Sequence, residues 1–157
     1  MKVSFYLCGK TTQPYLIEGL RLYTERIKHF IPFEIVTLPG VRKKGKMNEN
    51  ELKKKEGEIV LKRLSTSDFL ILLDEKGKEY DSKKFSGYID KLILSGQKQV
   101  TFLIGGPYGF SPEIYQHSNH MISLSKMTFS HQMVRLVFLE QLYRAFTIIK
   151  GMPYHNS

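Results

Sequence analysis

The chain has 157 residues, of which 41% are hydrophobic and 25% charged, a balance that fits one soluble globular domain over residues 1–157 with a sizeable core. Its single cysteine, Cys8, excludes an internal disulfide and a multi-cysteine zinc site, so we expect a reducing, cytoplasmic location and no metal. Because the chain contains no run of about 18 apolar residues, we expect no membrane span.

Basic residues outnumber acidic ones by 24 to 15, which gives a formal net charge of +9. For a domain of this size, such an excess favours a polyanionic partner, with nucleic acid first, although a merely basic surface has the same composition. One loop gathers four cations that are either phosphate contacts or a solvated charged segment: Arg42, Lys43, Lys44 and Lys46. Charge alone indicates neither the kind of nucleic acid nor a catalytic activity.

Short apolar runs alternate with helical periodicity along the whole chain. The runs predict strands over residues 2–7, 33–38, 69–73, 100–104 and 121–124. Helical spacing predicts one helix between Pro14 and Pro32, a second over about 49–64, and a last one over about 130–150. Asn48 is the expected cap of the second helix. A further helix is expected after its cap Asp81, and a short one from residue 111 onward. A turn over 74–77 is expected after the third strand. The alternation predicts an α/β domain with a mostly parallel sheet and helices on both faces.

The ends of three predicted strands mark the candidate site. In an open α/β sheet, ligands bind beyond the C-terminal ends of the strands. Loops leave such ends after Leu73, after Ile104 and after Leu124. If these strands are neighbours, the three loops converge on one pocket.

Two of these loops have a composition that suits a ligand. Residues 105–109 (GGPYG) allow a ligand to approach the backbone, but they match neither a Walker A loop nor a dinucleotide fingerprint, and a tight strand-to-helix turn is the alternative. Residues 124–129 (LSKMTF) combine backbone donors with apolar side chains and can surround an adenine. The alternative is a simple loop that places Met127 and Phe129 in the core.

The closing helix is apolar nearly all round, which predicts burial on both faces. In a domain of this size, another subunit is the simplest cover for the second face, so we expect a homodimer with this helix in the interface. Arg135 lies within the apolar stretch and needs a partner, either a glutamate such as Glu140 or an anionic ligand. In the tail, His155 can titrate near neutral pH and Tyr154 can stack on a base, unless the terminus is disordered.

Five segments of the chain closely resemble the RlmH family of SPOUT-class methyltransferases, which act on large-subunit ribosomal RNA. They are KKKEGE, LLDEKGKEYDS, FLIGGPYGFS, SLSKMTFSHQMVRLVFLEQLYRAF and PYH, and the resemblance extends over essentially the whole chain. It implies a C-terminal trefoil knot and a homodimer in which one subunit's tail contributes to the site around the other's cofactor. It also implies methylation at N3 of a pseudouridine in the helix 69 loop of 23S rRNA, on the assembled ribosome.

The same resemblance implies that S-adenosylmethionine is held within the part of the chain from 73 to 155. The residues that match the family's cofactor contacts are Leu73, Gly105, Leu124, Ser125, Lys126, Met127, Thr128 and Phe129. For catalysis, we expect His155 to assist loss of the N3 proton or to hold the base, Tyr154 to position the pseudouridine, and Arg135 to orient the substrate or stabilise the developing anion.

The chain departs from the family pattern directly after the Tyr-His pair. Many relatives carry a basic residue there, whereas Asn156 and Ser157 follow here, so we expect no phosphate contact at that position. Two alternatives remain open: a SPOUT-class enzyme that acts on another RNA such as tRNA, and a non-catalytic RNA-binding module.

Overall fold

Five strands form one sheet in which all neighbouring pairs are parallel, in the order β2-β1-β4-β3-β5. In this computed structural model, which describes residues 1–41 and 45–156, the strands are β1 (Lys2–Cys8), β2 (Phe33–Leu38), β3 (Phe69–Glu79), β4 (Gln99–Ile104) and β5 (His120–Ser123). The predicted parallel sheet is confirmed. The order also makes β4, β3 and β5 neighbours, the condition on which the predicted pocket depends.

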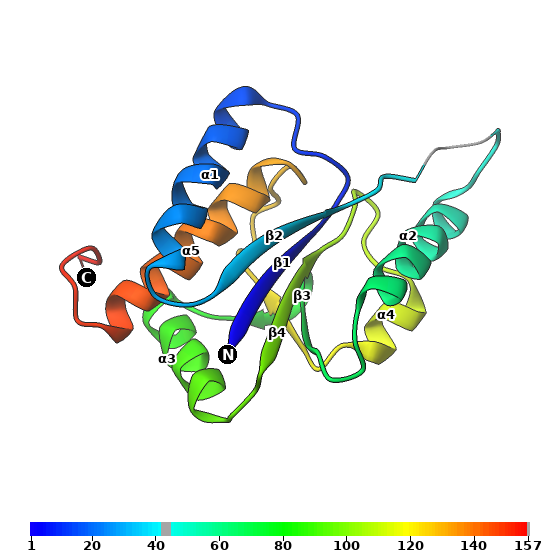
Figure 1. Cartoon of the computed structure of the whole chain (residues 1–157). Coiled ribbons are helices and arrows are strands. Elements are labelled where there is room, and N and C mark those ends of the chain that lie inside the picture. Colours follow the sequence, from blue (N-terminus) through cyan, green and yellow to red (C-terminus); the bar gives the residue numbers. More distant parts are fainter. Residues whose placement is uncertain (42–44, 157) are drawn as a thin grey trace.

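Helices cover both faces of this sheet. They are α1 (Pro14–Lys28), α2 (Glu49–Arg63), α3 (Ser82–Leu94), α4 (Pro112–His117) and α5 (Met133–Ile149). Figure 1 shows α1, α3 and α5 on one face and α2 and α4 on the other. Each face has its own apolar cluster, with Phe102 and Phe138 in the first and Leu103 and Ile114 in the second. The predicted α/β domain with helices on both faces is therefore confirmed.

Local signals account for where several helices begin. The Asn48 side chain accepts the backbone N–H of Glu51 at 2.9 Å, and Asp81 accepts that of Lys84 at 2.7 Å. Each bond satisfies one of the N–H groups that a helix start leaves without a partner. Pro14 occupies the first turn of α1, where its missing N–H has no consequence.

The predicted turn over 74–77 is wrong, because β3 continues to Glu79. Its pairing with β5 shifts register between Leu73 and Lys78. Gly77 permits this contact, since a Cβ at that position would lie 2.5 Å from the backbone nitrogen of Ile122. The polar residues after Leu73 thus belong to the strand but lie between its two pairings with β5, where they border the candidate site.

The last helix begins three residues later than predicted. The Ser130 hydroxyl accepts the N–H of Met133 at 3.1 Å, and the Ser130 carbonyl accepts that of Val134 at 3.0 Å. Ser130 therefore has the capping contacts expected of it, although α5 itself starts only at Met133. The intervening residues form a turn.

Neighbouring helices of the same chain cover much of the second apolar face of α5. Leu136 packs against α1, where a Cβ on Gly19 would lie 2.9 Å from its Cδ1. Leu139 is completely buried. The apolar surface of this helix therefore supports a dimer less strongly than the sequence suggested, because α1 and α3 pack against it. Among the described residues, no helix combines the length and apolarity needed to cross a membrane.

Candidate active site

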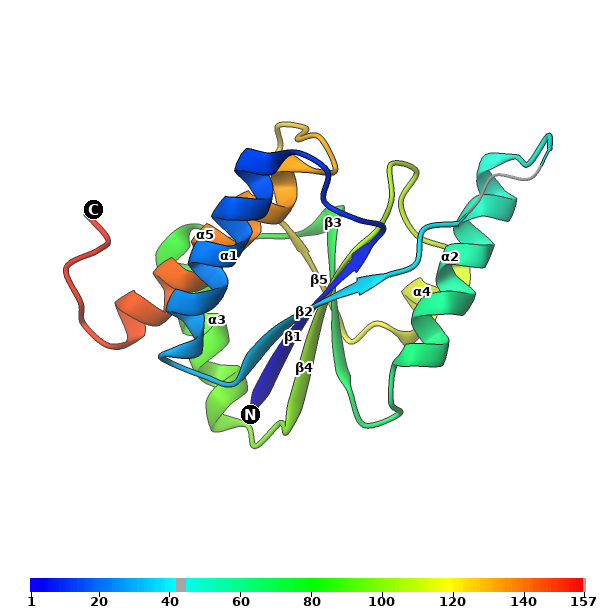
Figure 2. The same cartoon turned by 45° about the horizontal axis from the view of Figure 1, so that its top comes forward.

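A cavity of about 540 Å³ opens where β4, β3 and β5 end beside one another. Three stretches that are distant in the sequence form most of its lining: residues 73–76, 104–110 and 122–131. Figure 2 shows the loop after β4 and the loop before α5 rising at the same edge of the sheet. The three loops converge as predicted, because adjacent parallel strands release their C-terminal ends on one side.

All eight residues predicted to contact a cofactor line this cavity: Leu73, Gly105, Leu124, Ser125, Lys126, Met127, Thr128 and Phe129. β3 supplies the first, the end of β4 leads into the second, and the segment between β5 and α5 supplies the other six. The lining is thus mostly loop backbone and small or apolar side chains, the kind of surface that encloses a small organic ligand.

Residues 105–109, the glycine wall, form a tight turn that also lines the cavity. The N–H of Gly109 donates to the carbonyl of Gly106 at 3.2 Å, and Gly109 has a φ of +84°. A Cβ on Gly105 would lie 2.9 Å from the Phe110 ring. The wall therefore needs glycine for its turn and for its packing. The two interpretations of this segment, a tight turn and a ligand wall, are compatible.

The segment over 124–129 is held by hydroxyl groups at its base. The Ser123 hydroxyl donates to the Ser125 carbonyl at 3.2 Å, and the Ser125 hydroxyl accepts the N–H of Met127 at 2.9 Å. The side chains of Met127 and Phe129 are 77% and 37% exposed. The alternative in which these two residues belong to the core is therefore wrong, and both are available to a ligand.

Two polar residues of the cavity were not singled out from the sequence. Tyr115 donates its hydroxyl to Asp74 at 2.5 Å, and the other carboxylate oxygen of Asp74 accepts the N–H of Lys76. Burial and then the neighbouring carboxylate raise the pKa of Tyr115 to about 12. The phenol therefore remains a donor that orients Asp74 at the cavity wall. The available signal was that Asp74 directly follows the apolar part of β3.

Arg135 lies outside the cavity lining and binds the loop between β1 and α1. Its guanidinium donates to the carbonyls of Cys8 and Gly9 at 3.2 and 3.1 Å and to the Thr11 hydroxyl at 2.8 Å. The predicted pairing with Glu140 is wrong, because that carboxylate binds a different arginine. Arg135 is 1% exposed, and burial lowers its pKa. In this chain, Arg135 joins α5 to the first strand-end loop.

The C-terminal tail packs against α1 and α5, which contradicts a disordered terminus. Tyr154 donates its hydroxyl to Glu140 at 3.1 Å, and the Tyr23 hydroxyl lies 3.3 Å away. Arg144 lies over the Tyr154 ring, 4.8 Å from its centroid, and its Nη1 donates to Nδ1 of His155 at 3.1 Å. Burial, then the hydrogen bond with Tyr23, raises the pKa of Tyr154.

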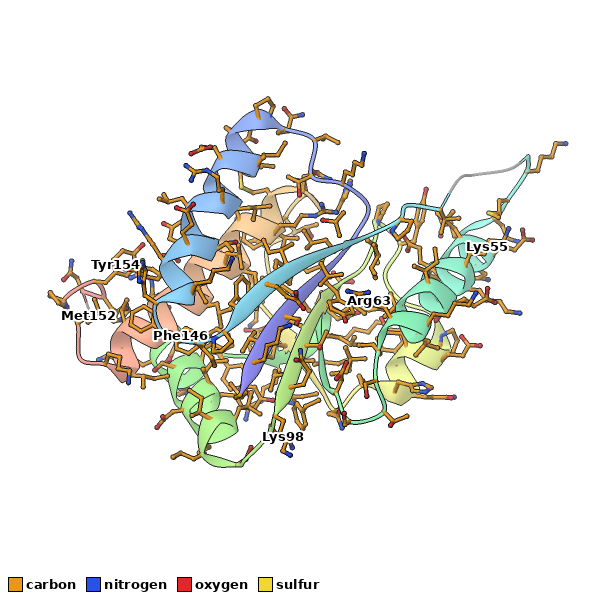
Figure 3. All side chains as sticks on the ribbon, viewed as in Figure 1. Lys55, Arg63, Lys98, Phe146, Met152 and Tyr154 are labelled. Carbon is orange, nitrogen blue, oxygen red and sulfur yellow. The ribbon has the colours of Figure 1, made fainter. Side chains whose placement is uncertain are left out.

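The tail and the cavity lie at opposite ends of α5. Val134 at the start of the helix lines the cavity, whereas Arg144 near its end holds the tail. Ten residues of α-helix separate them, about 15 Å at the standard rise. Figure 3 shows Tyr154 beside the C-terminal end of α5, well away from the strand ends. Tyr154 and His155 are therefore not brought to the cavity of their own chain, and Arg135, although next to Val134, binds the loop after β1 instead.

Comparison with known proteins assigns the family. A family model described as "Predicted SPOUT methyltransferase" matches residues 1–155. The chain belongs to the SPOUT methyltransferase family. Relatives named "Ribosomal RNA large subunit methyltransferase H" include those of Cytophaga hutchinsonii (53% identity over 156 residues, 99% of this chain and 100% of the relative) and Christiangramia forsetii (50% over 156 residues, 99% of each). That of Parabacteroides distasonis is 47% identical over 157 residues, the full length of both.

The likeness to this SPOUT subfamily over full length confirms the resemblance found in the sequence motifs. Membership implies the C-terminal knot of the family for the segment that contains the cavity. The described residues contain no cluster of three or more histidine, cysteine or acidic side chains placed to bind a metal. Of the four loop cations expected at phosphates, Lys46 is exposed, and residues 42–44 lie outside the described part of the chain.

Proposed function

We propose that this protein transfers a methyl group from S-adenosylmethionine to N3 of a pseudouridine in the helix 69 loop of 23S rRNA, on the assembled ribosome. The observation that carries the proposal is the cavity at the ends of β4, β3 and β5, whose lining includes all eight cofactor positions. The names of the relatives and the net charge of +9 support ribosomal RNA as the substrate.

The residues present fit this cofactor. The cavity volume of about 540 Å³ lies within the usual range of small-molecule sites, roughly 300–1,000 Å³. The backbone of residues 124–129 would bind the adenine edge, Leu73 would contact its face, and Gly105 would let the ligand approach the main chain. Asp74 places a carboxylate at the wall, which complements the positive charge of the ligand.

When bound, the cofactor supplies a methyl group that its sulfonium activates. The protein then has to hold the uracil N3 in line with that methyl carbon and exclude water. Methyl transfer would leave the cofactor as S-adenosylhomocysteine, and the N3 proton would pass to solvent or to a base. We assign the positioning of the pseudouridine to Tyr154 and the contact with its reacting edge to His155. Arg135 would act through the loop after β1 that it binds.

The contact between Arg144 and His155 restricts which ring nitrogen of the imidazole can carry a proton. A guanidinium can only donate, so Nδ1 of His155 is the acceptor and carries no proton. A neutral ring then carries its proton on Nε2 and offers an N–H donor to the substrate. This arrangement favours holding a base oxygen, with stabilisation of the charge that develops there, over removal of the N3 proton.

The separation of tail and cavity within one chain supports a homodimeric site. About 15 Å of helix lies between the cavity lining and the contacts of Tyr154 and His155. A tail supplied by the partner subunit would not have to cross this distance to reach the cavity. Sedimentation at assay concentration should therefore give a dimer. A monomer with full activity would contradict the composite site.

The decisive assay follows methyl transfer from labelled S-adenosylmethionine to ribosomes, isolated large subunits, free 23S rRNA and tRNA in parallel. We expect label in 23S rRNA, with whole ribosomes as the best substrate. The labelled pseudouridine should become resistant to chemical reagents that modify N3. Transfer to tRNA alone would identify a SPOUT enzyme with another target. Cofactor binding without transfer to any ribosomal particle would defeat the proposal.

A further inference from the structure

A half-buried carboxylate lies behind the glycine wall, on the side away from the candidate cofactor. Glu56 lies on the inward side of α2 and lines a small void of about 10 Å³ together with Cys8 and Ser111. This void shares Gly105, Gly109 and Phe110 with the main cavity. Glu56 and the proposed ligand therefore lie on opposite sides of the same turn.

The approach of α2 to this turn is too close for ordinary side chains. A Cβ built on Gly106 would lie 2.7 and 3.0 Å from the two carboxylate oxygens of Glu56. At the adjacent helical position, a Cβ on Gly57 would lie 2.5 Å from the hydroxyl oxygen of Ser111. The carboxylate therefore lies directly against Gly106, and a side chain at that position would have to displace it.

A partly buried carboxylate at this position carries a desolvation cost. Burial raises the pKa of Glu56, and hydrogen bonding from the backbone of Gly106 partly opposes that shift. Within residues 1–41 and 45–156, no ion pair involves this side chain. An apolar residue would fill the space without a desolvation cost, so the carboxylate is best explained by the polar backbone of Gly106 that it lies against.

We propose that Glu56 is a positioning residue for the cofactor cavity, which accepts the N–H of Gly106 and thereby fixes the backbone of the glycine wall against the bound ligand. The inference rests on the proposed function, because it takes S-adenosylmethionine as the occupant of the cavity. Glu56 does not touch that ligand. Its contribution is to hold Gly105 in the orientation that the ligand requires before the ligand binds. The free-energy cost of ordering the wall then does not weaken ligand binding.

Calorimetric titration with S-adenosylmethionine and with S-adenosylhomocysteine tests this role in the full-length protein. Glu56→Ala should weaken both by about tenfold, the effect of losing one hydrogen bond to a charged acceptor. Glu56→Gln should stay within about threefold of wild type, because its carbonyl oxygen accepts the same N–H. Glu58→Ala is the matched control, since this exposed glutamate of the same helix has no contact with the wall and should change nothing.

A kinetic readout separates positioning from general weakening of the fold. Glu56→Ala should raise the KM for the cofactor while kcat at saturating cofactor stays within about twofold of wild type. A change confined to kcat, or equal cofactor affinity of Glu56→Ala and wild type, would overturn the inference. It would also fail if Glu56→Gln bound as weakly as Glu56→Ala. Wild-type protein that binds no cofactor would instead defeat the proposed function.

A double-mutant cycle covers the case in which Glu56→Ala does not fold. Gly106→Ala should weaken binding because its methyl group meets the carboxylate, and Glu56→Asp should weaken it by withdrawing the acceptor. In the double variant the shorter side chain leaves space for the methyl group. Its loss of binding free energy should therefore be smaller than the sum of the losses in the two single variants. Full additivity would show that Glu56 does not act through Gly106.

Discussion

The cavity and the C-terminal tail are built in opposite ways, although both belong to the same proposed reaction. Loop backbone, glycine and small or apolar side chains make up most of the cavity lining. The tail is a network of aromatic and charged side chains in which Glu140 and Arg144 hold Tyr154 and His155. On the composite site proposed above, the cavity of one chain would bind the cofactor and the tail of a second chain would act on the substrate.

Blocking the cavity should produce the largest effect. Thr128 lines the cavity and is exposed, so Thr128→Trp adds a large ring there without removing a core contact. We expect a loss of cofactor affinity of about 100-fold or more, measured by calorimetry, with unchanged thermal unfolding. Thr66→Trp, at an exposed position outside the cavity lining, is the control. Normal binding by Thr128→Trp would place the cofactor elsewhere.

Removing the imidazole of the tail should affect the rate without affecting the cofactor. His155→Ala is expected to lower kcat by about 100-fold, the usual scale for loss of one positioned proton donor or acceptor. Its affinity for S-adenosylmethionine should equal that of wild type, because His155 lies outside the cavity lining. Full activity of this variant would remove the imidazole from the mechanism.

Coexpression of the two defective chains tests whether the site is composite. Thr128→Trp keeps an intact tail and His155→Ala keeps an intact cavity, so a mixed dimer holds one complete site. Random pairing makes about half of the dimers mixed, which predicts about a quarter of the wild-type rate from two nearly inactive variants. No recovery, with mixed dimers demonstrated by tagged chains, would show that tail and cavity act within one subunit.

Weakening the support of the tail should have a smaller effect than removing the imidazole. Arg144→Lys keeps the charge but loses the planar fork that donates to His155 while binding Glu140. We expect a decrease in kcat of about tenfold with unchanged cofactor affinity. Arg21→Lys, in an exposed ion-pair cluster on α1, is the matched control and should have the wild-type rate.

The smallest effect concerns the carboxylate behind the glycine wall. Because burial raises the pKa of Glu56 above its ordinary value of 4.5, ionisation of this group destabilises the folded state. The penalty is absent well below that value and grows as pH rises through the folded pKa. Glu56→Gln, which cannot ionise, should melt about 1–2 °C above wild type at neutral pH and equally at about pH 4. A lower melting temperature at neutral pH would contradict this sign.

Sequence reasoning reached the elements and the cavity because their signals are local. The caps at Asn48 and Asp81, the apolar strands and the glycine turn are each encoded within a few neighbouring residues. Parallel strands place their C-terminal ends on one side of the sheet, so the three loops converge because the structure makes β4, β3 and β5 neighbours. The same reasoning missed Asp74 because residues 74–77 were predicted to form a turn, and it missed Glu56 because a carboxylate on a charged helix has no local sign of burial.

By itself, the sequence determined the α/β class, the segments that line the cavity and the family, because periodicity, capping and motif identity are short-range properties. Only the tertiary structure decided the partners of Arg135, which lie more than 120 residues away in the chain, and the docking of Tyr154 beside Tyr23. It also decided that residues 74–77 belong to β3, between the two stretches of that strand that pair with β5. These outcomes depend on which segments the sheet brings together, and no local pattern specifies a contact between residues so distant in sequence.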